Sequence, residues 1–183
     1  MRRLRMLALA IALATLGFVP TAGAKDQHAA FELHLEVPNV ARASNGDTLA
    51  VTGMGAFAVH PKSVTASGTF IHTFAGGGSA SGAWTATDLL SFHFYGCGAI
   101  PSIGATLPPN LCGGALKMRV MFTPAGAAAI PGMITVFCVI GEKAPPTHDN
   151  PTQPGEEGMT AVIPGVANFN KIVSGMNVYV RTA

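Results

Sequence analysis

Alternation of apolar and polar residues at every second position is the dominant pattern in this chain. Residues 31–37 alternate without a fault, which predicts a strand with one buried and one solvent-facing side. Pro38 is expected to end this strand, and Gly53 and Gly55 are expected to mark a bend or bulge in the next. Strands with this period are predicted at 31–37, 48–60, 63–74, 82–94 and 116–122.

The later part of the chain adds less regular strand candidates. Residues 133–140 are apolar throughout, as is typical of a strand covered on both sides, and 160–163 and 177–181 complete the set. Short turns such as Asn45-Gly46-Asp47 and Gly76-Gly77-Gly78 predict antiparallel neighbours. We therefore expect an all-β fold: a single antiparallel barrel-like or sandwich domain of about eight strands.

The aromatic residues of the predicted strands favour a protein core over a lipid-facing surface. Phe57, Phe70, Trp84, Phe92 and Phe94 share the parity of the buried-looking aliphatic residues. An outer-membrane barrel is the weaker alternative, because its aromatic residues form girdles at the two membrane interfaces.

Two longer segments lack any period and are expected to be loops. Residues 96–114 contain three prolines and five glycines, and residues 142–158 contain four prolines. Loops of this length are often binding loops or disordered insertions.

The first 24 residues have the layout of a secretory signal peptide. Arg2, Arg3 and Arg5 precede an uncharged run at 6–19, and Ala22-Gly23-Ala24 supplies the small residues of a cleavage site. The apolar run is shorter than the ~20 residues of a spanning helix, so a retained membrane anchor is the less favoured alternative. We expect residues 25–183 to form one domain that is secreted or periplasmic.

Composition excludes several functional classes. The chain of 183 residues is 49% hydrophobic and only 11% charged, with a formal net charge of +2. This balance does not suit an acidic disordered chain or a basic nucleic-acid binder. The charge-free stretches 97–116 and 120–141 are interrupted by proline and glycine, so no integral membrane span is expected after signal cleavage.

Three cysteines are an odd number for an exported protein. Cys97 and Cys112 bracket the first long loop and are the preferred disulfide pair. Cys138 lies in an apolar strand candidate, which favours a buried free thiol. The alternatives are a disulfide between Cys138 and either other cysteine, or a role for Cys138 as a nucleophile or metal ligand.

No motif in the sequence carries a recognisable chemistry. Gly53-x-Gly55-x-x-Ala58 matches the loose dinucleotide fingerprint, but Pro61 and the continuing period of two exclude the helix that must follow it. Nucleophile elbows, phosphate-binding loops and paired CxxC zinc motifs are lacking in the sequence. We therefore expect no cofactor or metal and assign no catalytic residue.

Histidines and acids give weaker signals. His72 shares the apolar parity of Phe70, and Asp88 falls on the apolar parity of its strand. With His93, these residues are the candidate bases of an enzyme. The plainer interpretation has His72 ending its strand and reaching solvent, and a bulge at Thr87-Asp88 turning Asp88 outward.

Three functional hypotheses follow from these patterns. The first is a non-catalytic binding module for a small apolar molecule, held in the domain interior or at a mouth framed by the long loops. The second is a structural or surface-interaction protein, for example one that contacts cell-surface material. The third is an isomerase-like or cyclase-like enzyme. The residues proposed to contact a ligand are Phe70, His72, Trp84, Asp88, Phe92 and Phe94.

Overall fold

The computed structural model describes residues 29–145 and 157–182, and it confirms the predicted all-β antiparallel fold. The predicted signal peptide at 1–24 and most of the 142–158 loop lie outside the described residues. In order along the chain, the strands are β1 (Ala30–Arg42), β2 (Thr48–Ala58), β3 (Ser63–Thr73), β4 (Ser79–Cys97), β5 (Ala99–Ile100), β6 (Ala105–Thr106), β7 (Leu111–Pro124), β8 (Ile130–Cys138), β9 (Gly158–Ile163), β10 (Ala167–Phe169) and β11 (Lys171–Arg181).

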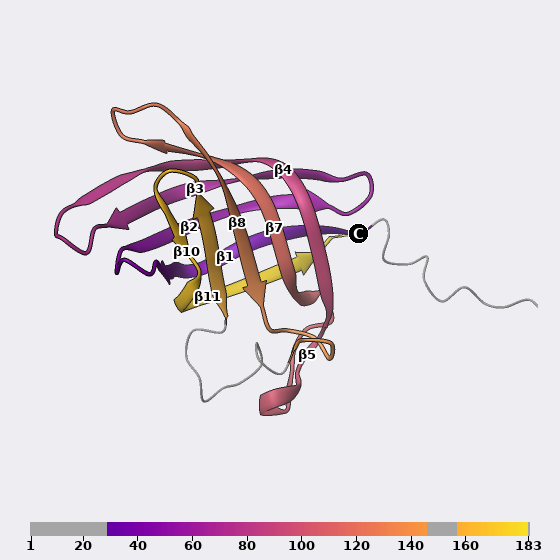
Figure 1. The fold of residues 1–183 in the computed structure, drawn as a ribbon. Coiled ribbons are helices and arrows are strands. Elements are labelled where there is room, and N and C mark those ends of the chain that lie inside the picture. The colour runs from indigo at the N-terminus through magenta and orange to yellow at the C-terminus, as the bar shows by residue number, and fades with distance from the viewer. Residues whose placement is uncertain (1–28, 146–156, 183) are drawn as a thin grey trace, which may run out of the picture.

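Nine of these strands form one sheet that curves into an incomplete barrel (Figure 1). Their order is β10-β9-β8-β7-β11-β1-β2-β3-β4, and β4 also pairs with β7 along most of its length. That second pairing closes β7, β11, β1, β2, β3 and β4 into a ring.

The shortest strand pairing in the ring is that between β11 and β7. Only the pairs Tyr179–Cys112 and Val180–Leu111 join these two strands. From Gly114 onward the same edge of β7 pairs with β8 instead. The barrel wall therefore forks at the start of β7, with β11 on one branch and β8 and β9 on the other.

Inward-facing side chains fill the barrel as the period of two predicts. Phe57, Phe70 and Trp84 are buried, whereas Phe92 and Phe94 are partly buried and pack against the same core. The ring of Phe92 lies 4.8 Å from that of Phe57 and 6.1 Å from that of Phe94, between centroids. Aromatic pairs at such separations contribute beyond their buried area.

β1 continues through Pro38 to Arg42, so the prediction that Pro38 ends the strand was wrong. The pairing of β1 with β11 shifts between Leu35 and Val37 and again between Val37 and Val40. A bulge accommodates proline because the residue there has no ladder hydrogen bond to donate. The bulge also directs Asn39 into the interior, where it is fully buried.

The predicted irregularity at Gly53 is found on one side of β2 only: the pairing with β1 shifts between Leu35–Gly53 and Asn39–Val51, whereas the pairing with β3 runs through Gly53 and Gly68 without a shift. Gly53 also makes room for an aromatic ring. A Cβ atom at Gly53 would lie 2.7 Å from Cζ2 of Trp84. The indole Nε1–H of Trp84 donates a 2.9 Å hydrogen bond to the carbonyl oxygen of Thr52, which fixes the ring there.

The segment predicted as the first long loop has structure of its own. β4 extends to Cys97, and β5 and β6 form a small hairpin around the 3-10 turn η1 (Pro101–Ile103) at one end of the barrel (Figure 1). The Cys97–Cys112 disulfide at its base confirms the preferred pairing. No helix in the described part of the chain is long and apolar enough to cross a membrane.

Candidate functional site

An open groove of about 510 Å³ lies against β1 and β11 at the disulfide end of the barrel. Small-molecule sites commonly occupy about 300–1,000 Å³. Its apolar lining consists of Ile100, Leu111, Ile140, Met176, Val178 and Val180, and its polar lining of His34, Glu36, Glu157 and Asn177.

The groove exists because the outer side of β11 is apolar. Met176, Val178 and Val180 alternate with Asn177 and Tyr179, which are buried on the inner side. Such an apolar outer row would normally be a solvation cost. Segments near the two predicted loops partly cover it: Ile100 comes from the disulfide hairpin, and Ile140 and Glu157 flank the second loop region.

Glu157 is the most unusual ionisable group in the groove. Its Oε1 accepts a 2.7 Å hydrogen bond from the backbone N–H of Asn177. Burial raises the pKa of this carboxyl from 4.5 to about 7, although that hydrogen bond and the neighbouring Cys138 thiol act in the opposite direction. Strongly perturbed carboxyls are concentrated at functional sites, which draws attention to this end of the barrel.

The amide of Asn177 bridges the fork in the barrel wall. Its Nδ2 lies 2.9 Å from Asn39 Oδ1, 2.9 Å from the carbonyl oxygen of Phe137 and 3.0 Å from that of Gly158, so its two hydrogens are shared among three acceptors. The hydroxyl of Tyr179 adds a 2.9 Å bond to the carbonyl of Val136. These side chains tie β11 to β1, β8 and β9 where the backbone ladder is interrupted.

One acceptor of Asn177 remains unpaired. Its Oδ1 is buried and has no hydrogen-bond partner among the described residues. Buried polar atoms of native proteins are nearly always paired with protein, water or ligand. This oxygen is therefore an unused acceptor on the inner side of β11.

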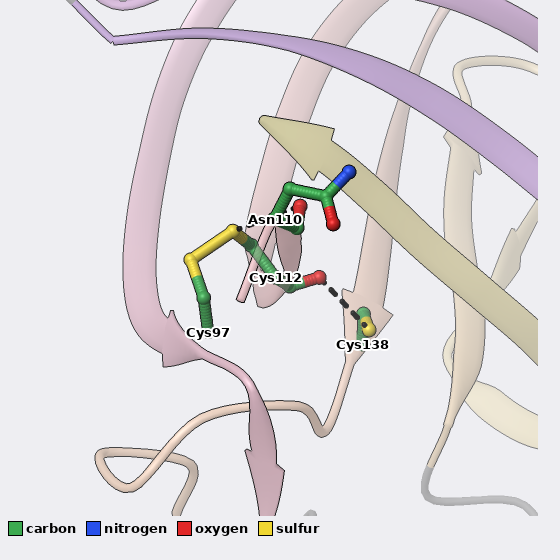
Figure 2. The surroundings of a disulfide bond; sticks show 4 residues. All are labelled: Cys97, Asn110, Cys112 and Cys138. Atoms are coloured by element: carbon green, nitrogen blue, oxygen red, sulfur yellow. Dashed lines mark hydrogen bonds between the residues drawn. A yellow bond between two sulfur atoms is a disulfide. The ribbon is translucent and has the colours of Figure 1, made fainter. Parts of the chain in front are cut away.

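Cys138 is a free, fully buried cysteine behind the disulfide, as predicted (Figure 2). Its thiol donates to the carbonyl oxygen of Cys112 at 3.5 Å. Burial and the nearby Glu157 carboxylate raise the pKa of the thiol. Since the thiolate is the reactive form, the surroundings of Cys138 suppress nucleophilic chemistry.

A second, apolar cavity of about 240 Å³ lies at the opposite end of β7. Phe70 and His72, two of the predicted ligand contacts, line it together with Phe122. His72 is only 7% exposed, so the interpretation that it reaches solvent was wrong.

Asp47 is the partner that holds His72 inside. His72 Nε2 lies 2.9 Å from Oδ2 of Asp47, whose Oδ1 accepts a 2.9 Å bond from the backbone N–H of Ala75. The bonds from Ala75 and His72 lower the pKa of Asp47. The pair forms because Leu49 at the start of β2 lies opposite His72 in the sheet, which brings the Asn45-Gly46-Asp47 turn over the end of β3.

The remaining predicted contacts lie elsewhere. Asp88 is exposed beside Arg119, with 3.5 Å between Oδ2 and Nη1, because a bulge turns it outward as the plainer interpretation expected. Trp84 is 1% exposed in the core, and Phe92 and Phe94 belong to the aromatic cluster around Phe57. The six residues thus do not converge on one place.

Sequence reasoning did not select Glu157, Asn177 or Asp47 as site residues. Glu157 follows an aperiodic stretch, and Asp47 was recognised only as part of a turn. The usable signal was Asn177, a polar residue that shares the inward parity of Tyr179 in β11.

The described residues contain no group of three or more His, Cys, Asp or Glu side chains suited to hold a metal ion. No protein-family model, curated protein or solved structure matches this chain. The groove is therefore interpreted through its own geometry.

Proposed function

We propose that this protein is a non-catalytic binding module whose groove beside β11 takes a small, largely apolar molecule. The observation that carries the proposal is the combination of a 510 Å³ volume, an apolar lining and a partly buried carboxyl at one side. A mostly apolar pocket with a few convergent polar groups is the usual form of a small-molecule site.

The groove is favoured over the cavity at His72 on grounds of size. The second cavity, at about 240 Å³, falls below the ~300 Å³ that small-molecule sites usually provide. The groove also has the framing that the sequence suggested for a ligand site, since Ile100 and Ile140 come from segments beside the barrel end.

Binding is favoured over catalysis because the thiol and the imidazole near the groove are not arranged as a nucleophile and its base. The Cys138 thiol has a raised pKa, and the nearest histidine, His34, contacts Glu32 at 3.3 Å on the sheet surface. Neither arrangement resembles an activated nucleophile with its base.

We further propose that the protein works outside the cytoplasm. The Cys97–Cys112 disulfide suits an oxidising compartment, and the signal-like residues 1–24 agree with export.

Methyl NMR can test the proposed binding function, because the two cavities carry different methyl groups. On titration with hexan-1-ol, the methyl signals of Ile100, Ile140 and Val178 should shift in a saturable manner. Those of Ile130, Ile163 and Val166, at the second cavity, serve as the internal control and should stay unchanged. Unchanged groove signals up to the solubility limit would favour the structural or surface-interaction hypothesis instead.

A further inference from the structure

We propose that the polar end of the ligand is a protonated amine, so that the groove binds alkyl or arylalkyl amines in preference to alcohols and acids. This inference rests on the proposed function and specifies its ligand class.

The polar lining of the groove is dominated by hydrogen-bond acceptors. Glu157 and Glu36 contribute carboxylates, whereas the side-chain amide of Asn177 is buried on the inner side of β11. The remaining polar residue is His34, which is already in contact with Glu32. A groove whose polar lining consists mainly of hydrogen-bond acceptors is complementary to a ligand that carries hydrogen-bond donors.

The ionisable residues that line the groove also favour a positively charged ligand. None of the residues that line the groove is Lys or Arg. Among residues 29–145 and 157–182, Glu157 forms no ion pair with a basic side chain. A partly buried carboxylate without a cation is a costly group, and a ligand ammonium would supply the missing countercharge.

The apolar lining describes the rest of the ligand. Val178 and Val180 come from β11, Ile100 from β5, Leu111 from β7 and Ile140 from the segment after β8. Such surfaces accept a hydrocarbon chain or a single ring and offer few partners for additional polar groups. An amino acid, whose own carboxylate would lie among those of Glu36 and Glu157, would therefore fit less well than a simple amine.

A matched series of six-carbon probes tests the inference. Dissociation constants for hexylamine, hexan-1-ol and hexanoate are measured by methyl NMR titration at pH 8, where the amine is protonated and most Glu157 is ionised. A charge-assisted hydrogen bond predicts hexylamine binding about tenfold more tightly than hexan-1-ol, and hexanoate more weakly than either.

Two isosteric variants locate the charge that provides this preference. Glu157→Gln keeps an acceptor for the Asn177 N–H but removes the negative charge, so the preference for hexylamine should fall to about twofold or less while hexan-1-ol binding is retained. Asp88→Asn removes the same charge at a distant exposed position and should retain the tenfold preference.

The possible results separate the inference from the function beneath it. Equal binding of the three probes would overturn the amine assignment and leave the binding function in place. Failure of all three to bind would overturn both. A tenfold amine preference that survives in Glu157→Gln would overturn the role assigned to Glu157.

Discussion

Glu157 and Asn177 are joined by a 2.7 Å hydrogen bond from the backbone N–H of Asn177 to the Glu157 carboxylate. The bond links the start of β9 to β11 on the two branches of the forked barrel wall. Because Asn177 also holds the carbonyls of Phe137 and Gly158, the groove and the fork share their supporting residues. The candidate binding site is thus built at the place where the backbone ladder is interrupted.

The raised pKa of Glu157 predicts that the folded protein loses stability as pH rises. Burial disfavours the charged form, so the folded state holds this proton up to a pKa of about 7, whereas the unfolded state releases it near 4.5. The free energy of unfolding should therefore fall by about 2 kcal/mol between pH 5 and pH 8 through this group.

Urea unfolding of the wild type and of Glu157→Gln at both pH values measures this contribution. The variant should lack that part of the decline, and the surface control Asp88→Asn should retain it. Parallel pH profiles for wild type and Glu157→Gln would show that the carboxyl is not buried as described.

Removal of the Asn177 amide should strongly destabilise the fold. Asn177→Ala leaves Asn39 Oδ1 and the carbonyls of Phe137 and Gly158 without this donor inside the barrel. We expect a loss of about 3 kcal/mol in the free energy of unfolding. Asn168→Ala, at an exposed position in β10, is the matched control and should change stability by less than about 0.5 kcal/mol.

Thiol counting tests the disulfide and the inert state of Cys138. The native protein should show no reactive thiol toward Ellman's reagent, since Cys138 is buried and its thiol pKa is raised. One thiol should react in denaturant and three after reduction. Rapid reaction of a native thiol would contradict the surroundings described for Cys138.

The same disulfide should contribute to stability. It closes a separation of 15 residues, for which the chain-entropy model gives ~3 kcal/mol. The double variant Cys97→Ala/Cys112→Ala should lose about that amount in urea unfolding, whereas equal stability would place the hairpin outside the cooperative unit.

The contact between Gly53 and Trp84 predicts that β2 does not tolerate a methyl group at this position. In Gly53→Ala the new Cβ would meet the carbonyl oxygen of Ser67 at 2.5 Å and the Trp84 ring at 2.7 Å. We expect a loss of about 2 kcal/mol and a shift in the fluorescence of Trp84, the single tryptophan.

Gly76→Ala is the control for this variant, because a Cβ there would meet no atom within 4 Å. Its unfolding free energy should stay within about 0.5 kcal/mol of the wild type. Similar losses in the two variants would indicate a general cost of replacing glycine instead of the contact with Trp84.

Local periodicity was sufficient to predict the inward side of β2 and β3, whereas in β4 register shifts after Ala86 and Leu89 interrupt the predicted parity, and Leu89 is buried in place of Leu90. Phe57, Phe70 and Trp84 face inward because burial of alternate side chains is a property of a single strand. Pro38 was misread because its tolerance depends on a bulge in the pairing with β11, which is distant in sequence.

The candidate site was not predictable in the same way. Glu157 and Asn177 are shielded from solvent where β11 and β8 both pair with β7. β11 is far from β7 in sequence, so their pairing leaves no local pattern that could be recognised. Asp47 likewise shows no sign of its contact with His72 until β2 and β3 are brought into register.

The most direct test of the proposed site is the measurement of intermolecular nuclear Overhauser effects between bound hexylamine and the methyl groups of the protein. We expect contacts from the hexyl chain to Ile140, Val178 and Val180 on the lining of the groove. Contacts only to Ile130, Ile163 and Val166 at the opposite cavity, or to neither set at saturating hexylamine, would contradict the proposed site.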